Sequence, residues 1–187
     1  MKSCIACLTI AMAVMITGLS PLYAQTSPTQ KKLLVVYFSK TGNTKKLATA
    51  IQKKTGADMV EIVPAVPYPD DYDQTVDIAR KEQDDDARPA VKTKINNMAS
   101  YEVVFLGYPS WWGTMPMAVF TFLEAHDLAG KTVIPFTTHE GSGFGRSVSD
   151  LRRLCPKSTI LDGLAIRGRD ADTAETEVPA WLQGLKY

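Results

Sequence analysis

Cysteine is scarce in this sequence. Only three of the 187 residues are cysteine, and two of them, Cys4 and Cys7, lie in an apolar stretch near the N-terminus. The rest of the chain holds Cys155 alone, so no internal disulfide is available there and stability must come from a hydrophobic core. The two histidines, His126 and His139, are widely spaced from each other and from Cys155. This spacing argues against a zinc site.

An excess of charge of either sign is also lacking. The chain has 21 Lys and Arg against 20 Asp and Glu, and removal of Lys2 with an N-terminal segment leaves 20 of each. There is no basic stretch, so nucleic acid is not expected as a partner. The only run of like charge, Asp84-Asp85-Asp86, is interpreted as a solvated helix end or loop.

The long apolar run of the chain lies at its N-terminus. Lys2 precedes an apolar stretch at residues 4–19, and the small residue Ala24 comes before Gln25. A positive start, a short apolar run and a small residue at the end predict a secretory signal at residues 1–24. We therefore expect an exported protein, periplasmic by default, without membrane insertion after cleavage. The alternative is an uncleaved anchor, although the run is short for a membrane span.

A polar linker is expected at residues 25–30, followed by one domain at residues 31–187. Apolar runs rich in β-formers predict strands, two of them weaker, at residues 33–38, 59–63, 103–108, 132–137 and 159–166. Amphipathic stretches predict helices at residues 44–55, 116–126, 147–154 and 173–185, with one polar helix within residues 64–90. This alternation predicts an α/β fold with a parallel sheet. Pro135 conflicts with its strand because proline lacks a ladder donor, but its neighbours are strong β-formers.

The first candidate functional loop is Ser39-Lys40-Thr41-Gly42-Asn43-Thr44, between a strand and a helix. A helix N-terminus offers unpaired N–H groups and partial positive charge, and the hydroxyls add donors, so the loop predicts a phosphate site. It matches neither the Walker loop nor the Gly-x-Gly-x-x-Gly pattern. Lys45 and Lys46 oppose the helix dipole in the first turn, which a bound anion would relieve. The alternative is an ordinary capped turn, with Asn43 or Thr44 as its N-cap.

The second loop is Pro109-Ser110-Trp111-Trp112-Gly113-Thr114-Met115-Pro116. Two adjacent tryptophans between prolines are hard to bury together in a loop. Stacking of an aromatic ligand on an indole explains them. The alternatives are a dimer contact and a partly buried aromatic cluster.

The third loop, at residues 137–145, carries Gly141, Gly143 and Gly145 beside hydroxyl side chains. Glycines at alternate positions allow the backbone to approach a flat ligand closely. His139 has no partnered cysteine and no nucleophile motif near it, so a hydrogen bond within the loop is at least as good an interpretation as catalysis.

Together these loops resemble those of flavodoxins. The matching motifs are Tyr-Phe-Ser-Lys-Thr-Gly-Asn-Thr at residues 37–44, Gly-Tyr-Pro-Ser-Trp-Trp-Gly-Thr-Met-Pro at 107–116 and Phe-Thr-Thr-His-Glu-Gly-Ser-Gly-Phe-Gly at 136–145. The resemblance runs from about residue 31 to the end and is to the short-chain type. It implies a three-layer α/β sandwich with a five-stranded parallel sheet of order 2-1-3-4-5 and a noncovalently bound FMN.

The resemblance also implies the residues of the cofactor site. The phosphate would be bound by Ser39, Lys40, Thr41, Gly42, Asn43 and Thr44. The flavin ring would be flanked by Pro109, Ser110, Trp111, Trp112, Gly113, Thr138, His139, Gly141, Ser142 and Gly143. Two features depart from the family pattern, since cytoplasmic flavodoxins are strongly acidic and lack a secretion signal.

Three functions remain open on this reading. The first is an FMN-binding electron carrier outside the cytoplasm, whose partner is a redox protein or a quinone. The second is an enzyme that passes reducing equivalents from NAD(P)H to a quinone or flavin. In that case the segment at residues 64–90, including Tyr68 and Tyr72, would serve as a lid; the alternative is that it is only a solvated connection. The third is a non-redox flavin-binding module. Either a monomer or a homodimer is compatible with the sequence.

Overall fold

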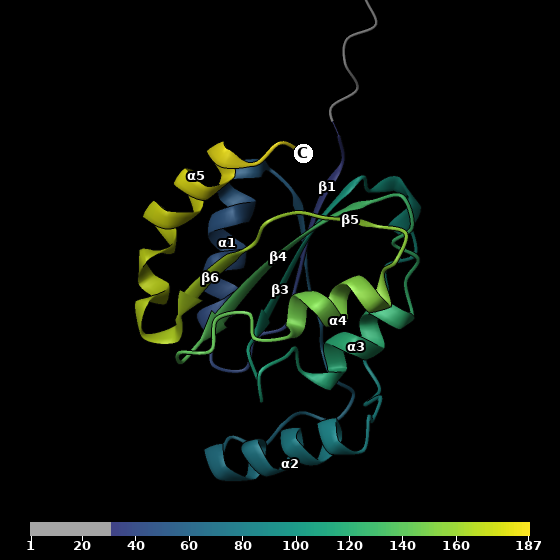
Figure 1. Ribbon diagram of the computed structural model, residues 1–187, viewed down its shortest axis with the longest axis vertical. Coiled ribbons are helices and arrows are strands. Elements are labelled where there is room, and N and C mark those ends of the chain that lie inside the picture. The colour runs from purple at the N-terminus through teal and green to yellow at the C-terminus, as the bar shows by residue number, and fades with distance from the viewer. Residues whose placement is uncertain (1–30) are drawn as a thin grey trace, which may run out of the picture. The chain divides into compact units, whose positions relative to one another are not determined.

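The apolar runs form a central parallel sheet in the computed structural model, which describes residues 31–187 (Figure 1). The strands are β1 Leu33–Tyr37, β2 Asp58–Glu61, β3 Val103–Pro109, β4 Thr132–His139, β5 Thr159–Ile160 and β6 Leu164–Arg167. Their order is β2-β1-β3-β4-β5, which confirms the predicted flavodoxin-like order. The expected signal peptide at residues 1–24 and linker at residues 25–30 lie outside the described residues.

The last strand differs from its prediction. Residues 159–166 do not form one strand, because β5 and β6 pair with β4 separately and residues 161–163 lie between them. The N–H of Leu161 donates to the carbonyl of Val133. The backbone N–H and C=O groups of every second residue of β4, counted from Val133, therefore point toward the last strand. Pro135 is the next such residue and has no N–H to donate. The missing donor therefore lies where the last strand is interrupted.

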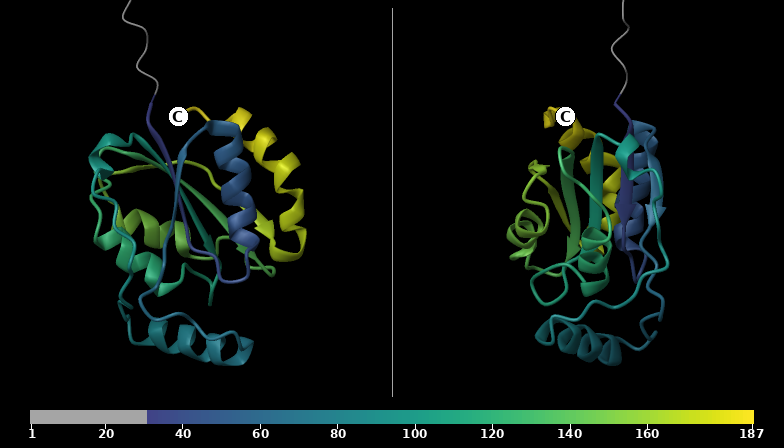
Figure 2. Two further views of the ribbon diagram at one scale, coloured as in Figure 1. Left: turned by 180° about the vertical axis from the view of Figure 1, so that it is seen from behind. Right: turned by 90° about the vertical axis from the view of Figure 1, so that its right-hand side faces the viewer.

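Helices cover both faces of the sheet (Figures 1 and 2). They are α1 Asn43–Thr55, α2 Tyr72–Asp84, α3 Met117–Glu124, α4 Ser147–Leu154 and α5 Ala174–Gly184, with short 3-10 helices at Met98–Ser100 and Gly168–Thr173. Helices α1 and α5 share one hydrophobic core with the sheet, and α3 and α4 share the other. No helix within residues 31–187 is long and apolar enough to cross a membrane.

Alternate strand residues supply the two cores. In β1, Leu34 and Val36 belong to the core under α3 and α4, whereas Val35 and Tyr37 belong to the core under α1 and α5. This alternation follows from the two-residue period of a strand. It explains why the strands read as continuous apolar runs, since both faces of the sheet are covered.

Helix α2 covers neither face. It lies beyond the carboxyl ends of the strands in all three views (Figures 1 and 2), and none of its residues belongs to either core cluster. The segment that carries it is closed at its base by an antiparallel bridge between Pro64 and Val91. The N–H of Ala65 donates to the carbonyl of Ala90 at 2.7 Å. We call residues 64–91 the cap segment.

Candidate functional site

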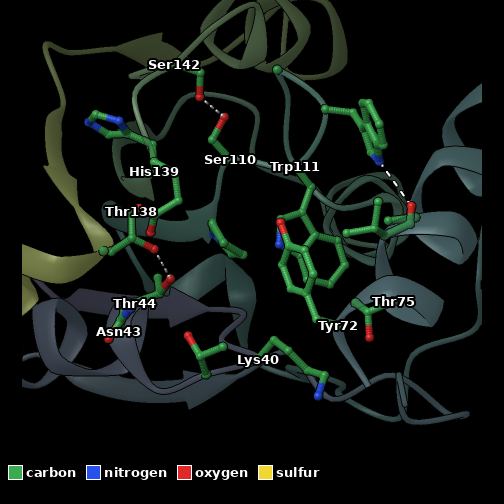
Figure 3. Close-up of a pocket in the computed structure, with 18 of the residues that line it drawn as sticks. Lys40, Asn43, Thr44, Tyr72, Thr75, Ser110, Trp111, Thr138, His139 and Ser142 are labelled. Atoms are coloured by element: carbon green, nitrogen blue, oxygen red, sulfur yellow. Dashed lines mark hydrogen bonds between the residues drawn. The ribbon is translucent and has the colours of Figure 1, made fainter. Parts of the chain in front are cut away.

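A cavity of about 660 Å³ opens at the carboxyl ends of the strands, between the three predicted loops and α2 (Figure 3). The predicted residues that line it are Lys40, Thr41, Asn43, Thr44, Pro109, Ser110, Trp111, Trp112, Gly113, Thr138, His139, Gly141 and Ser142. The predicted residues outside its lining are Ser39, Gly42 and Gly143. The three loops therefore meet around one space, as expected where parallel strands end.

The first loop ends in the N-terminus of α1. Gly42 is the N-cap residue and has no side chain to cap the helix, so the alternative with Asn43 or Thr44 as N-cap is wrong. The hydroxyl of Ser39 accepts from the N–H of Gly42 at 3.1 Å and from the N–H of Lys45 at 3.3 Å. Ser39 thus shapes the loop from within. The N–H groups of Asn43 and Thr44 belong to the first turn, where a helix has no acceptor of its own.

A buried pair of hydroxyls joins the first loop to the third. The side-chain oxygens of Thr44 and Thr138 lie 2.8 Å apart, and both residues are almost fully buried. Figure 3 shows this pair in one half of the cavity, near Asn43. Because one hydroxyl donates and the other accepts, the bond fixes the distance between α1 and the end of β4.

The side chain of Lys40 points away from the N-terminus of α1. Its ammonium lies 3.6 Å from a carboxylate oxygen of Asp70 in the cap segment. Figure 3 shows the ammonium directed away from Asn43 and Thr44. Lys40 is therefore placed to contribute its backbone to the first loop and its charge to another part of the cavity. Lys46 likewise turns aside and pairs with Asp172 at 2.6 Å.

The second loop is a tight hairpin. Trp111 and Thr114 exchange two backbone hydrogen bonds, of 2.9 and 3.0 Å, around Trp112 and Gly113. Both turn residues have positive φ, 48° for Trp112 and 76° for Gly113, which is the pattern of a type I′ turn. Glycine accepts this backbone freely, but a bulky residue such as Trp112 adopts it only when its surroundings hold it there.

The adjacent tryptophans have different surroundings. Trp111 packs edge-on against Phe38 and Tyr68, with ring centroids 5.4 and 5.0 Å away. Trp112 is 45% exposed; its indole N–H donates to the carbonyl of Val76 in α2 at 3.1 Å. The guanidinium carbon of Arg80 lies 4.5 Å from the centre of the Trp112 ring. Trp111 therefore forms the partly buried cluster considered above, and Trp112 connects the second loop to the cap segment.

The third loop packs on the second. The N–H of Ser110 donates to the carbonyl of Thr138 at 2.8 Å, and the hydroxyls of Ser110 and Ser142 lie 2.9 Å apart. His139 accepts from the N–H of Gly141 through Nδ1 at 2.9 Å. The loop hydrogen bond expected for His139 is thus present.

A buried tyrosine supports both loops from beneath. The phenol of Tyr108 lies 2.9 Å from the hydroxyl of Ser147, at the start of α4, and burial raises the pKa of Tyr108 above its ordinary value. The neighbouring Thr114 hydroxyl donates to Asp150 at 2.7 Å. These bonds attach the end of β3 and the hairpin to α4, so the second loop is held in position by a helix.

Sequence reasoning missed seven residues of the lining, and all of them except Glu140 lie outside the three loops. The missed residues are Asp70, Tyr72, Thr75, Val76, Ala79, Glu140 and Gly168. Four of these are spaced at i, i+3, i+4 and i+7 along α2, a pattern visible in the sequence that marks one helix face. The pattern does not say what the face covers, and α2 was expected only within a solvated connection or a lid.

Comparison of the chain with known protein families and solved structures finds flavodoxins and flavoproteins. A family model described as flavodoxin matches residues 32–185. No protein in the curated set matches. Among solved structures, a candidate flavoprotein from Bacteroides eggerthii is 38% identical, with 83% of this chain and 99% of that chain covered and a TM-score of 0.73. A candidate flavoprotein from Bacteroides uniformis is 31% identical, with 82% and 98% covered and a TM-score of 0.72.

A more distant structure carries a ligand. The flavoprotein from Lactobacillus acidophilus, solved in complex with FMN, is 23% identical, with 78% of this chain and 99% of that chain covered and a TM-score of 0.65. At this identity the comparison shows a shared fold. All three structures are matched over 98% or more of their own length.

Proposed function

Because the chain belongs to the flavodoxin family, we propose that it binds FMN noncovalently in the cavity at the carboxyl ends of the strands and transfers electrons. The observation that carries this proposal is the meeting of the three loops around one cavity that ends at the N-terminus of α1. The flavoprotein from Lactobacillus acidophilus, which shares the fold, was solved with FMN. The phosphate of FMN matches the lining formed by the N-terminus of α1 and its neighbouring hydroxyls. The flat flavin ring matches the lining formed by the second and third loops.

The phosphate end of the cavity fits a dianion. The first turn of α1 contains no acidic residue, and the helix leaves its first N–H groups without helical acceptors. Thr41 and Thr44 line the cavity beside these groups. Lys45 follows directly, so its repulsion by the helix dipole is offset when an anion binds, whereas Lys46 is already paired with Asp172.

The ring end fits a planar group. The hairpin at Trp111–Thr114 and the glycine-rich third loop both line the cavity, and hydrogen bonds hold one on the other. When bound, FMN supplies one- and two-electron redox chemistry. The residues of the chain bind it, orient it between the two loops and restrict access of water.

The phosphate assignment is tested by removing hydroxyls. Thr41→Val and Thr44→Val should each weaken FMN binding about tenfold, because a hydrogen bond to a charged group contributes roughly 1.5–3 kcal/mol. Binding of riboflavin, which lacks the phosphate, should change less than about twofold on the same reasoning. Isothermal titration of apoprotein with each flavin measures both affinities.

Thr49→Val is the matched control, since the Thr49 hydroxyl donates to the carbonyl of Lys45 on the same helix and does not line the cavity. It should leave both flavin affinities unchanged. Equal losses for FMN and riboflavin in the loop variants would refute the phosphate assignment. Purified protein that is colourless and takes up no FMN would refute the proposed function itself.

The proposed place of action is outside the cytoplasm, in the periplasm. The support is the sequence of residues 1–24, with Lys2, a short apolar run and Ala24 at its end. Mature protein recovered from a periplasmic fraction should begin at Gln25 when its N-terminus is sequenced. Material that begins at Met1 would contradict cleavage.

A second candidate is a reductase that passes electrons from NAD(P)H to a quinone or flavin. One observation favours it: the face of α2 that carries Val76 and Ala79 extends the cavity lining beyond the three loops. Rapid oxidation of NADH by the FMN-loaded protein when a quinone is present would favour the reductase. Absence of such turnover, with reversible reduction by a chemical reductant, would favour the carrier.

A further inference from the structure

Helix α2 satisfies its terminal backbone groups within its own segment. At its N-terminus the carboxylate of Asp71 accepts from the N–H of Gln74 at 2.8 Å. At its C-terminus the N–H of Ala87 donates to the carbonyl of Glu82 at 2.8 Å, a bond that closes a Schellman motif. No residue of α2 belongs to either core cluster of residues 31–187. The helix can therefore change its position without leaving its capped ends unpaired.

The two limbs of the cap segment, by contrast, are anchored to the body of the domain. In the limb before α2, the ring of Tyr68 packs edge-on against Phe38 and Trp111, with centroids 5.8 and 5.0 Å away. In the limb after α2, the guanidinium of Arg88 donates to the carboxylate of Glu124 in α3 through two bonds of 2.8 Å. The cap segment is therefore fixed where it leaves the sheet and where it returns.

One hydrogen bond joins α2 to the anchored limb before it. The phenol of Tyr68 donates to the carboxylate of Glu82 at 2.7 Å, and neither residue lines the cavity. Tyr68 is held in the aromatic cluster, whereas Glu82 belongs to α2. The bond therefore holds the helix in its place against a fixed point, and we call it the latch.

Helix α2 forms one wall of the cavity. Thr75 and Ala79 line the cavity and are buried, although they belong to neither core cluster. Figure 3 shows Thr75 across the cavity from Thr44 and Thr138. The three loops stand at the ends of core strands, whereas α2 has no core of its own. It is therefore the wall that can move at small cost, because local opening favours elements with few buried apolar contacts.

Resting on the proposed function, we propose that α2 is a gate for FMN. It moves away from the cavity about the short connections at residues 69–71 and 85–87 to admit the cofactor, and it closes over the bound cofactor. Hinges of this kind are formed by a few residues at the ends of an element. The latch between Tyr68 and Glu82 holds the gate closed.

A latch of this kind has a kinetic signature. It is made in the closed state whether the cavity is empty or filled, so it lowers the open fraction of both forms by the same factor. Its loss therefore speeds entry and exit of FMN alike and leaves Kd unchanged. A residue that contacts the cofactor behaves differently, because its loss weakens Kd, mainly through faster dissociation.

The test removes the latch from either side. Tyr68→Phe keeps the ring in the aromatic cluster and removes the phenol, and Glu82→Ala removes the acceptor on α2. Stopped-flow mixing of the full-length apoprotein with FMN, followed by flavin fluorescence, measures association, and dilution of the complex measures dissociation. Both rate constants should rise about tenfold in each variant, as expected for the loss of one hydrogen bond to a charged group. Kd from equilibrium titration should change less than about twofold.

Tyr101→Phe is the matched control. The phenol of Tyr101 donates to the carboxylate of Asp58 at 2.6 Å, and neither residue lines the cavity or belongs to the cap segment. The variant loses an equivalent bond and should leave both FMN rate constants unchanged. Hydrogen exchange in residues 72–84 should become faster in Tyr68→Phe but not in Tyr101→Phe.

The outcomes separate the gate from the proposed function. A wild-type chain that takes up no FMN would refute the proposed function and, with it, a gate for FMN. An FMN-binding chain whose two rate constants stay unchanged in both latch variants would overturn the gate and leave FMN binding standing. So would faster dissociation alone with a weaker Kd, or equal rate changes in Tyr101→Phe. If one latch variant does not fold, as judged by circular dichroism, the other decides.

Discussion

At the scale of single residues, one glycine allows the second and third loops to touch. Gly145 has a φ of 51°, and a Cβ atom there would clash with the carbonyl oxygen of Gly113. The same carbonyl accepts from the N–H of Arg146 at 2.8 Å. Both the backbone conformation and the space therefore require glycine. The contact matters because these two loops form the walls of the cavity.

Gly145→Ala should destabilise the fold by about 1–3 kcal/mol, since the left-handed backbone and the clash with main chain both add cost. Urea unfolding followed by circular dichroism measures the change. Gly184→Ala is the control: Gly184 ends α5 with no atom within 4 Å of the added Cβ. It should be neutral or stabilising by up to about 1 kcal/mol. An unchanged urea midpoint for Gly145→Ala would contradict the clash.

At the scale of elements, α2 depends on a few side chains for its position. Trp112 joins it to the second loop, and the phenol of Tyr68 donates to Glu82 at 2.7 Å. Burial and this bond raise the pKa of Tyr68, and burial raises the pKa of Glu82. The phenol therefore stays neutral and able to donate. Arg88 anchors the end of the cap segment to Glu124 through two bonds of 2.8 Å.

Trp112→Asn should loosen α2 while leaving the sheet intact. Asparagine tolerates a left-handed backbone, so the variant removes the indole contacts without adding strain. Hydrogen exchange in residues 72–84 should become about tenfold faster, as expected for the loss of one hydrogen bond and one cation–π contact. Ile78→Ala is the control on the same helix. Faster exchange across β1 and β3 as well would show global destabilisation and contradict a local role.

At the scale of the whole molecule, stability and ligand binding are linked. Within residues 31–187 Cys155 is the single cysteine, and it is free and buried, so the described domain is held by its two cores and not by an internal disulfide. Burial raises the pKa of the Cys155 thiol to about 11, so it stays protonated and unreactive.

Added FMN should raise the melting temperature with its concentration. At 100 times Kd, binding to the folded state alone adds about 2.7 kcal/mol, which for a domain of this size corresponds to roughly 5–10 °C. Riboflavin at equal concentration should raise it less, because it lacks the phosphate. Thermal scans over a concentration series measure both. A melting temperature independent of FMN concentration would contradict binding to the native state.

Much of the site could be predicted because its signals are local. The strands at residues 33–38 and 103–108 were visible as apolar runs, and the loops after them as unusual clusters of hydroxyls, glycines and tryptophans. A cluster of glycines and hydroxyl residues just after a strand lies within a short stretch of the chain, so it can be recognised from the sequence alone. The sheet order, by contrast, came from the resemblance to flavodoxins, and the structure confirmed it.

The amino-acid sequence by itself determined the strands, the helices and the three loops, since each depends on periodicity and residue type within a short window. Only the tertiary structure decided where α2 lies, where Lys40 points and that the last strand breaks opposite Pro135. These depend on contacts between distant segments, such as the bond from Trp112 to Val76, 36 residues apart. A helix face shows in a sequence, but the surface it meets is chosen by the packing of the whole chain.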